Sequence, residues 1–148
     1  MDRALFILIS LLSITIVLIF GDALYVGFWY YIAIPLVAFL LTLPFKPHQL
    51  FLTGISLVIQ LTLITYLYIN LTTERPEGLL VLGHLFSLPG LAVGIIATSI
   101  YVKSKSKNKY IMLAIGFSGA SLGFVINQLI ICNTLIYCGK FMSPLISR

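Results

Sequence analysis

Five long apolar runs separated by short polar stretches constrain this chain more than any other feature of its sequence. An α-helix needs roughly 17 to 25 predominantly apolar residues to cross the hydrocarbon core of a bilayer, and each run has that length. The runs do not alternate with a period of two, which argues against a transmembrane β-barrel. The sequence therefore predicts an all-α fold. It is a single transmembrane domain of residues 1–148 with spans at 4–20, 25–45, 49–71, 78–102 and 110–132.

The composition agrees with a lipid environment. Hydrophobic residues make up 60% of the chain and charged residues only 9%, whereas about a quarter of the residues of a soluble domain are charged. The formal net charge of +5 could indicate nucleic acid, but four of the nine Lys and Arg residues lie in the short stretch 103–109 between two predicted spans. Retention of basic loops on the cytoplasmic side explains that stretch. We therefore expect a bilayer as the partner and no nucleic acid.

The basic residues also orient the spans. With the N-terminus inside, six Lys and Arg residues fall on the cytoplasmic side and three on the outer side. Because basic residues in short loops stay cytoplasmic, we expect the N-terminus inside and the C-terminus outside, in the inner membrane of a bacterium. An alternative stays open for the first span, which could be a cleaved signal peptide with the small residues Gly21 and Ala23 near the cleavage point.

Four polar side chains lie inside the predicted spans at a similar depth. Counted from the outer ends at about 1.5 Å per residue, His84, Asn127, Gln128 and Thr65 all fall within roughly 10 Å of the outer boundary. Polar groups inside a membrane need partners because water is absent there. We predict that these residues form a polar cluster that binds a partner, while simple hydrogen bonding between helices stays open as the alternative.

The fourth and fifth spans carry packing signals. Pro89 has no N–H to donate to the carbonyl four residues earlier, so we expect a kink there and another donor for the freed carbonyl. Gly90 with Gly94, and Gly119 with Gly123, are small residues four positions apart. Such pairs let two backbones approach closely. They predict tight packing of these two spans on each other, or association of two copies of the chain into a homo-oligomer.

The two cysteines, Cys132 and Cys138, lie at the outer end of the fifth span. The compartment outside the cytoplasm is oxidising, so a disulfide that closes this small loop is one expectation. A helix that continued through the loop would hold the sulfurs too far apart. The spacing differs from the Cys-x-x-Cys pair of a disulfide-exchange enzyme.

The sequence lacks the residue sets that catalysis requires. No predicted helix carries His and Glu at metal-ligand spacing, and no Ser, His and acid set or phosphate-binding glycine loop is present. We therefore expect no enzyme activity, no metal and no cofactor. The four acidic residues lie in loops or at span ends, which disfavours an ion-coupled transporter. A channel lined by Ser, Thr and Asn stays open.

In organisation, as a small basic polytopic chain without a catalytic set, this protein resembles the inner-membrane immunity proteins that protect bacteria from pore-forming or membrane-directed toxins. The resemblance implies that the chain acts by binding a protein toxin in the plane of the membrane. His84, Asn127 and Gln128 would meet the toxin helices, and the outer loop of residues 72–78 would add charge specificity. The collection of polar groups in one leaflet favours this function. The alternative is a small channel, a permease or an accessory subunit of a membrane complex.

Overall fold

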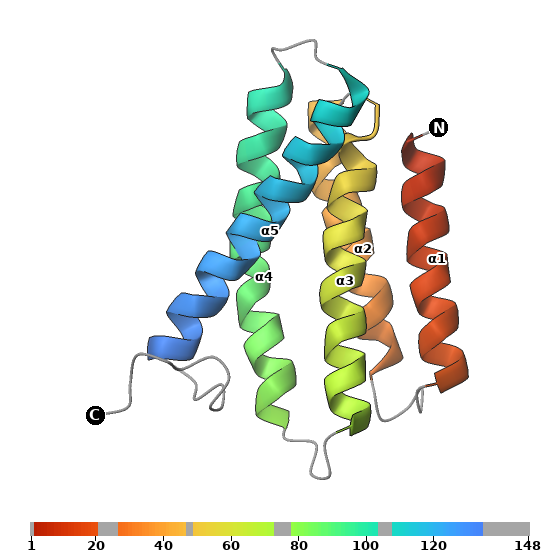
Figure 1. The fold of residues 1–148 in the computed structure, drawn as a ribbon, viewed down its shortest axis with the longest axis vertical. Coiled ribbons are helices and arrows are strands. Elements are labelled where there is room, and N and C mark those ends of the chain that lie inside the picture. Colours follow the sequence, from red (N-terminus) through yellow and green to blue (C-terminus); the bar gives the residue numbers. More distant parts are fainter. Residues whose placement is uncertain (1, 21–26, 47–48, 73–77, 104–107, 135–148) are drawn as a thin grey trace.

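The computed structural model describes residues 2–20, 27–46, 49–72, 78–103 and 108–134. These residues are helical throughout apart from short connections, and they contain no strand, which confirms the all-α prediction (Figure 1). The elements are α1 (Asp2–Phe20), α2 (Phe28–Thr42), the short 3₁₀ helix η1 (Leu43–Phe45), α3 (Phe51–Thr72), α4 (Gly78–Lys103) and α5 (Lys109–Thr134).

Each α-helix corresponds to one of the five predicted spans. All five are long and apolar enough to cross a membrane, with η1 completing the second span. The boundaries differ from the predicted ones by a few residues, since α1 begins at Asp2 and α5 continues to Thr134. Continuous apolar sequence determines where a helix is stable in lipid, but caps and turns determine its last residues.

The helices form one bundle in which α3 is central (Figure 1). Of the α3 span, 56% is buried inside the protein, against 22% of the α1 span. Successive helices alternate in direction, and α5 crosses α4 and α3 obliquely. The largest contact between two helices is that of α4 with α5, followed by that of α3 with α5.

Glycines bring α4 and α5 together. A Cβ atom at Gly94 would overlap the carbonyl oxygen of Gly119, and one at Gly123 would overlap that of Gly90. Gly119 in turn leaves the space that the side chain of Thr98 occupies. The four glycines of the sequence pairs therefore all lie in the contact between α4 and α5 within one chain, where the missing side chains allow backbone-to-backbone packing.

A second glycine contact joins α3 to α5. A Cβ atom at Gly54 would overlap the Leu113 carbonyl oxygen, and one at Gly116 would overlap the Phe51 carbonyl oxygen. Gly54 has no glycine or alanine four residues away on either side, so the spacing rule does not find it. The close approach of α5 to both α3 and α4 explains why α5 lies across them.

Asp2 caps the beginning of α3. One carboxylate oxygen accepts the Leu52 N–H at 3.0 Å, and the other accepts the Thr53 N–H at 2.9 Å and the Thr53 hydroxyl at 2.5 Å. The first N–H groups of a helix have no partner within the helix, and its N-terminus carries partial positive charge. The Asp2 carboxylate of α1 therefore accepts hydrogen bonds from the free N–H groups of α3 and balances the partial positive charge there. It also holds the N-termini of the two helices side by side.

Candidate functional site

His84 is the centre of a buried polar cluster in the half of the bundle that holds the end of α3 and the beginning of α4. Its imidazole is fully buried, and Nδ1 is hydrogen bonded to the hydroxyl of Tyr30 on α2. The ring also packs against Tyr66 of α3, with centroids 4.3 Å apart, and against Phe124 of α5 at 5.3 Å. Four helices thus meet at one side chain.

Gln128 forms the second part of this cluster. Its Oε1 accepts the hydroxyl of Ser87, which is also bonded to the Gly83 carbonyl. Its amide nitrogen lies 3.4 Å from the Tyr66 hydroxyl and 3.4 Å from Cys132 Sγ. Gln128 is 5% exposed. The His84 cluster, as this group is called below, consists of six side chains joined by hydrogen bonds and ring contacts: Tyr30, Tyr66, His84, Ser87, Gln128 and Cys132.

Asn127 occupies a different place from its neighbour. Its amide nitrogen donates to the carbonyl of Phe86 at 2.7 Å, across the contact between α5 and α4. Phe86 lies three residues before Pro89, and α4 continues through that proline. The carbonyl that Pro89 leaves without its helical donor is that of Leu85, four residues back, so the Asn127 bond lies one residue beyond the predicted position.

The structure does not bring Thr65 into the cluster. Thr65 is exposed on α3, and its hydroxyl donates to the Leu61 carbonyl of its own helix at 2.7 Å. The next residue, Tyr66, points into the bundle instead, because successive residues of a helix are about 100° apart around its axis. Of the two cysteines of the predicted bridge, Cys132 belongs to α5 and Cys138 lies outside the described residues.

A second polar series lies in the other half of the bundle, between α1 and α3. The amide of Gln60 donates to the Ser10 hydroxyl at 3.3 Å, and Ser56 is 3.5 Å from the Phe6 carbonyl. This series continues to Thr53 and its bonds with Asp2. Buried polar groups therefore occur at two depths, and the prediction that they gather in one half of the bundle is corrected.

Packed apolar side chains separate the two polar regions. Gln60 and Tyr66 are six residues apart on α3, about 9 Å along the helix axis. Leu63 lies between them, fully buried in one hydrophobic core with Val17, Ile34 and other apolar side chains. An apolar layer thus divides the two groups of polar side chains within the described part of the bundle.

One ring nitrogen in this cluster is buried without a hydrogen-bond partner. His84 Nε2 has no hydrogen-bond partner within the described part of the chain, and the same holds for Gln60 Oε1 and Ser99 Oγ. Within that part no three His, Cys, Asp or Glu side chains gather to hold a metal ion.

Comparison with protein-family models, with curated proteins and with solved structures finds no match.

Sequence reasoning found His84 and Gln128 but missed their partners. Tyr30 and Tyr66 lie near the ends of their spans, where tyrosines ordinarily belong to the aromatic belts of the membrane interface. A phenol within a span still needs a hydrogen-bond partner, and that requirement could have indicated the two tyrosines as partners of the buried polar residues. Ser87 gave no signal of its own, because a serine in a membrane helix commonly bonds to its own backbone.

Proposed function

We propose that this chain is a multi-pass protein of the bacterial inner membrane, with its N-terminus inside, that acts by binding another polypeptide within the membrane. Its proposed class is an immunity protein against a membrane-directed toxin. The sequence supports insertion through five apolar runs and supports the orientation through the basic stretch 103–109. The five helices, all long enough to cross, support the same placement.

The observation that carries a binding function over a transport function is the closure of the bundle. The polar side chains that a conducting path would use are bonded to each other, and fully buried Leu63 lies between the two polar regions. A conducting path is lined by polar groups or filled with water, and an apolar constriction closes it by excluding water. A sealed bundle instead offers a partner its outer helix surfaces.

The proposed contact surface follows from which polar residues are buried and which are exposed. His84 and Gln128 are buried, so they hold the helices in place and do not themselves meet a partner. Asn127 lies partly exposed on α5, beside the exposed side chains of Phe86 and Ile126. An amide set in an apolar helix surface can hydrogen bond to a polar group of an approaching helix. We therefore assign the partner contact to this surface of α4 and α5.

The test is protection of a bacterium that expresses this protein against the product of the gene beside its own. Growth and membrane potential are recorded after toxin challenge. We expect protection by the unaltered chain and its loss in Asn127→Leu, with the amount of inserted protein unchanged. Ser118→Ala is the matched control, because Ser118 is an exposed polar residue of the same helix that bonds to its own backbone at the Ala114 carbonyl.

Two outcomes would overturn the proposal. Absence of protection against every neighbouring gene product would remove the immunity function. Ion or solute flux through the purified protein in sealed vesicles would favour the alternative, a small channel, permease or transport subunit. The closed packing around Leu63 predicts vesicles that stay sealed.

A further inference from the structure

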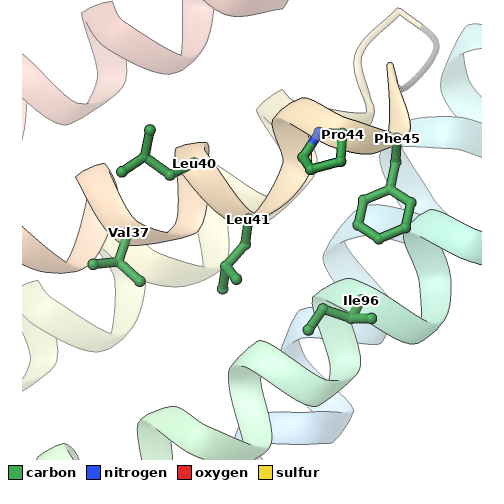
Figure 2. Close-up of a pocket in the computed structure, with 6 residues that line it drawn as sticks. All are labelled: Val37, Leu40, Leu41, Pro44, Phe45 and Ile96. Atoms are coloured by element: carbon green, nitrogen blue, oxygen red, sulfur yellow. The ribbon is translucent and has the colours of Figure 1, made fainter.

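An apolar groove lies between the end of α2 and the last third of α4 (Figure 2). Its volume is about 380 Å³, within the range of roughly 300 to 1,000 Å³ that small-molecule sites occupy. Figure 2 shows Leu41 and Phe45 pointing from α2 and η1 toward Ile96 of α4. The lining residues are all apolar: Val37, Leu40, Leu41, Pro44, Phe45 and Ile96.

The groove arises from the way α2 ends. The regular helix stops at Thr42, and η1 continues the chain for one tighter turn that includes Pro44. Lys46 then ends η1 with a φ of 45°, in the left-handed region that non-glycine residues adopt rarely. The backbone thus changes direction beside α4, and the side chains of the last α2 turns leave a furrow that no other described helix fills.

Two lysines lie near one end of this groove, the end on the proposed cytoplasmic side. Lys46 directly follows the lining residue Phe45 and is exposed. Lys103 is the last residue of α4, seven positions after Ile96, and is also exposed. Seven residues are about two helical turns, so Ile96 and Lys103 share one side of α4. An apolar furrow with a cation at the same end of each wall is complementary to an anionic amphiphile.

Two further observations bear on this end of the bundle. Ser99 lies between Ile96 and Lys103 on the same side of α4, and its buried hydroxyl has no hydrogen-bond partner among the described residues. Asp2 is the one acidic side chain within the described ranges, and its carboxylate is engaged with the beginning of α3. No described carboxylate therefore competes for the two lysines.

We propose that this groove binds an acyl chain of an anionic phospholipid whose phosphate is held by Lys46 and Lys103. The proposal rests on the membrane placement and orientation given above. The apolar lining alone would not select one lipid over another, since acyl chains and apolar side chains are equally at home in a bilayer. Selectivity comes from the headgroup, because basic pockets between helices at the cytoplasmic face bind anionic headgroups.

The experiment uses the full chain reconstituted in vesicles of equal parts phosphatidylglycerol and phosphatidylcholine. Lipid that stays bound after gentle extraction is counted by native mass spectrometry. We expect phosphatidylglycerol to be retained preferentially. Each lysine near a membrane surface changes the attraction of an anionic lipid about fivefold. The double variant Lys46→Gln/Lys103→Gln should therefore lower the ratio of retained phosphatidylglycerol to phosphatidylcholine by roughly 25-fold.

Two matched variants distinguish a built site from general surface charge. Arg3→Gln/Lys109→Gln removes the same charge from the beginnings of α1 and α5, at residues that do not line the groove, and should leave the ratio unchanged. Ile96→Trp fills the groove without altering charge, and should lower the retention of phosphatidylglycerol. Equal losses in the two charge variants, or full retention in Ile96→Trp, would overturn the proposal.

A flotation experiment tests separately whether the chain is inserted in the membrane. A chain that does not float with the vesicles in a density gradient is not inserted, and the proposed function and this site then fail together. A chain that floats but retains the two lipids equally refutes the lipid site alone. Retention of a peptide or of a second copy of the chain in place of lipid would also refute it.

Discussion

The hydroxyl of Tyr30 and Nδ1 of His84 are hydrogen bonded across the contact between α2 and α4, joining residues 54 positions apart in the sequence. Tyr30 is half-buried and His84 fully buried. Because the imidazole also contacts rings from α3 and α5, this one bond joins α2 to the rest of the His84 cluster. Its loss would leave a buried nitrogen of His84 without a partner.

Tyr30→Phe should therefore destabilise the folded chain. A buried polar atom left unsatisfied costs about 1 to 3 kcal/mol, and the substitution keeps the ring and removes only the hydroxyl. The free energy of unfolding in detergent micelles, measured by titration with a denaturing detergent, checks this value. Trp29→Phe is the control, since Trp29 is 78% exposed and should change little. Equal stability of the two variants would contradict the role given to the bond.

Asp2→Ala should weaken the attachment of α1 to α3. The substitution removes a carboxylate that caps two N–H groups and a hydroxyl of α3, and loss of a helix cap costs roughly 0.5 to 2 kcal/mol. Asp2→Asn should lose less, because an amide oxygen still accepts hydrogen bonds at a helix N-terminus. Arg3→Gln, at the exposed neighbouring position, serves as the control. Hydrogen exchange at the Leu52 and Thr53 amides reports the effect where it occurs.

Gly94→Ala should disturb the contact between α4 and α5. The added Cβ would overlap the Gly119 carbonyl oxygen, which belongs to the backbone and cannot rotate away. Overpacking of this kind costs about 1 to 3 kcal/mol. Gly83→Ala on the same helix is the matched control, because its Cβ would meet the nearest atoms at 3.8 and 4.0 Å, an ordinary contact distance. Thermal unfolding midpoints of the two variants should differ, with Gly94→Ala the lower.

The proposed topology predicts where reporters become active. A reporter that works only in the cytoplasm should be active when fused at the N-terminus or in the stretch 104–107, and one that works only outside should be active after residue 148. Replacement of Lys103, Lys105, Lys107 and Lys109 by Gln should reduce the fraction of chains with this orientation, because the basic stretch holds the loop inside. Unchanged reporter activity in that variant would show that other features set the orientation.

The number and positions of the helices could be predicted because lipid imposes a simple requirement on sequence. An apolar run of sufficient length forms a helix to satisfy its backbone, whatever its neighbours are. The contact between α4 and α5 could also be predicted. Gly90 and Gly94 face Gly119 and Gly123, and the four-residue spacing within each pair is a sequence pattern of close helix packing.

The partners of the buried polar groups could not be predicted from the sequence. Depth along a span can be counted from a sequence, but direction around a helix axis depends on which neighbours pack there. Thr65 and Tyr66 have almost the same depth, yet only Tyr66 reaches Gln128. Asp2 reaches Thr53 because α1 and α3 are neighbours, a tertiary fact that no local pattern near residue 2 carries.

The attachment of Asp2 to the beginning of α3 sets an order on biosynthesis. The carboxylate of Asp2 is made first, whereas the amides of residues 52 and 53 are made only after the rest of α1 and all of α2. The bond can therefore form only after α1 and α2 have been made, and it then joins the first helix of the chain to the third.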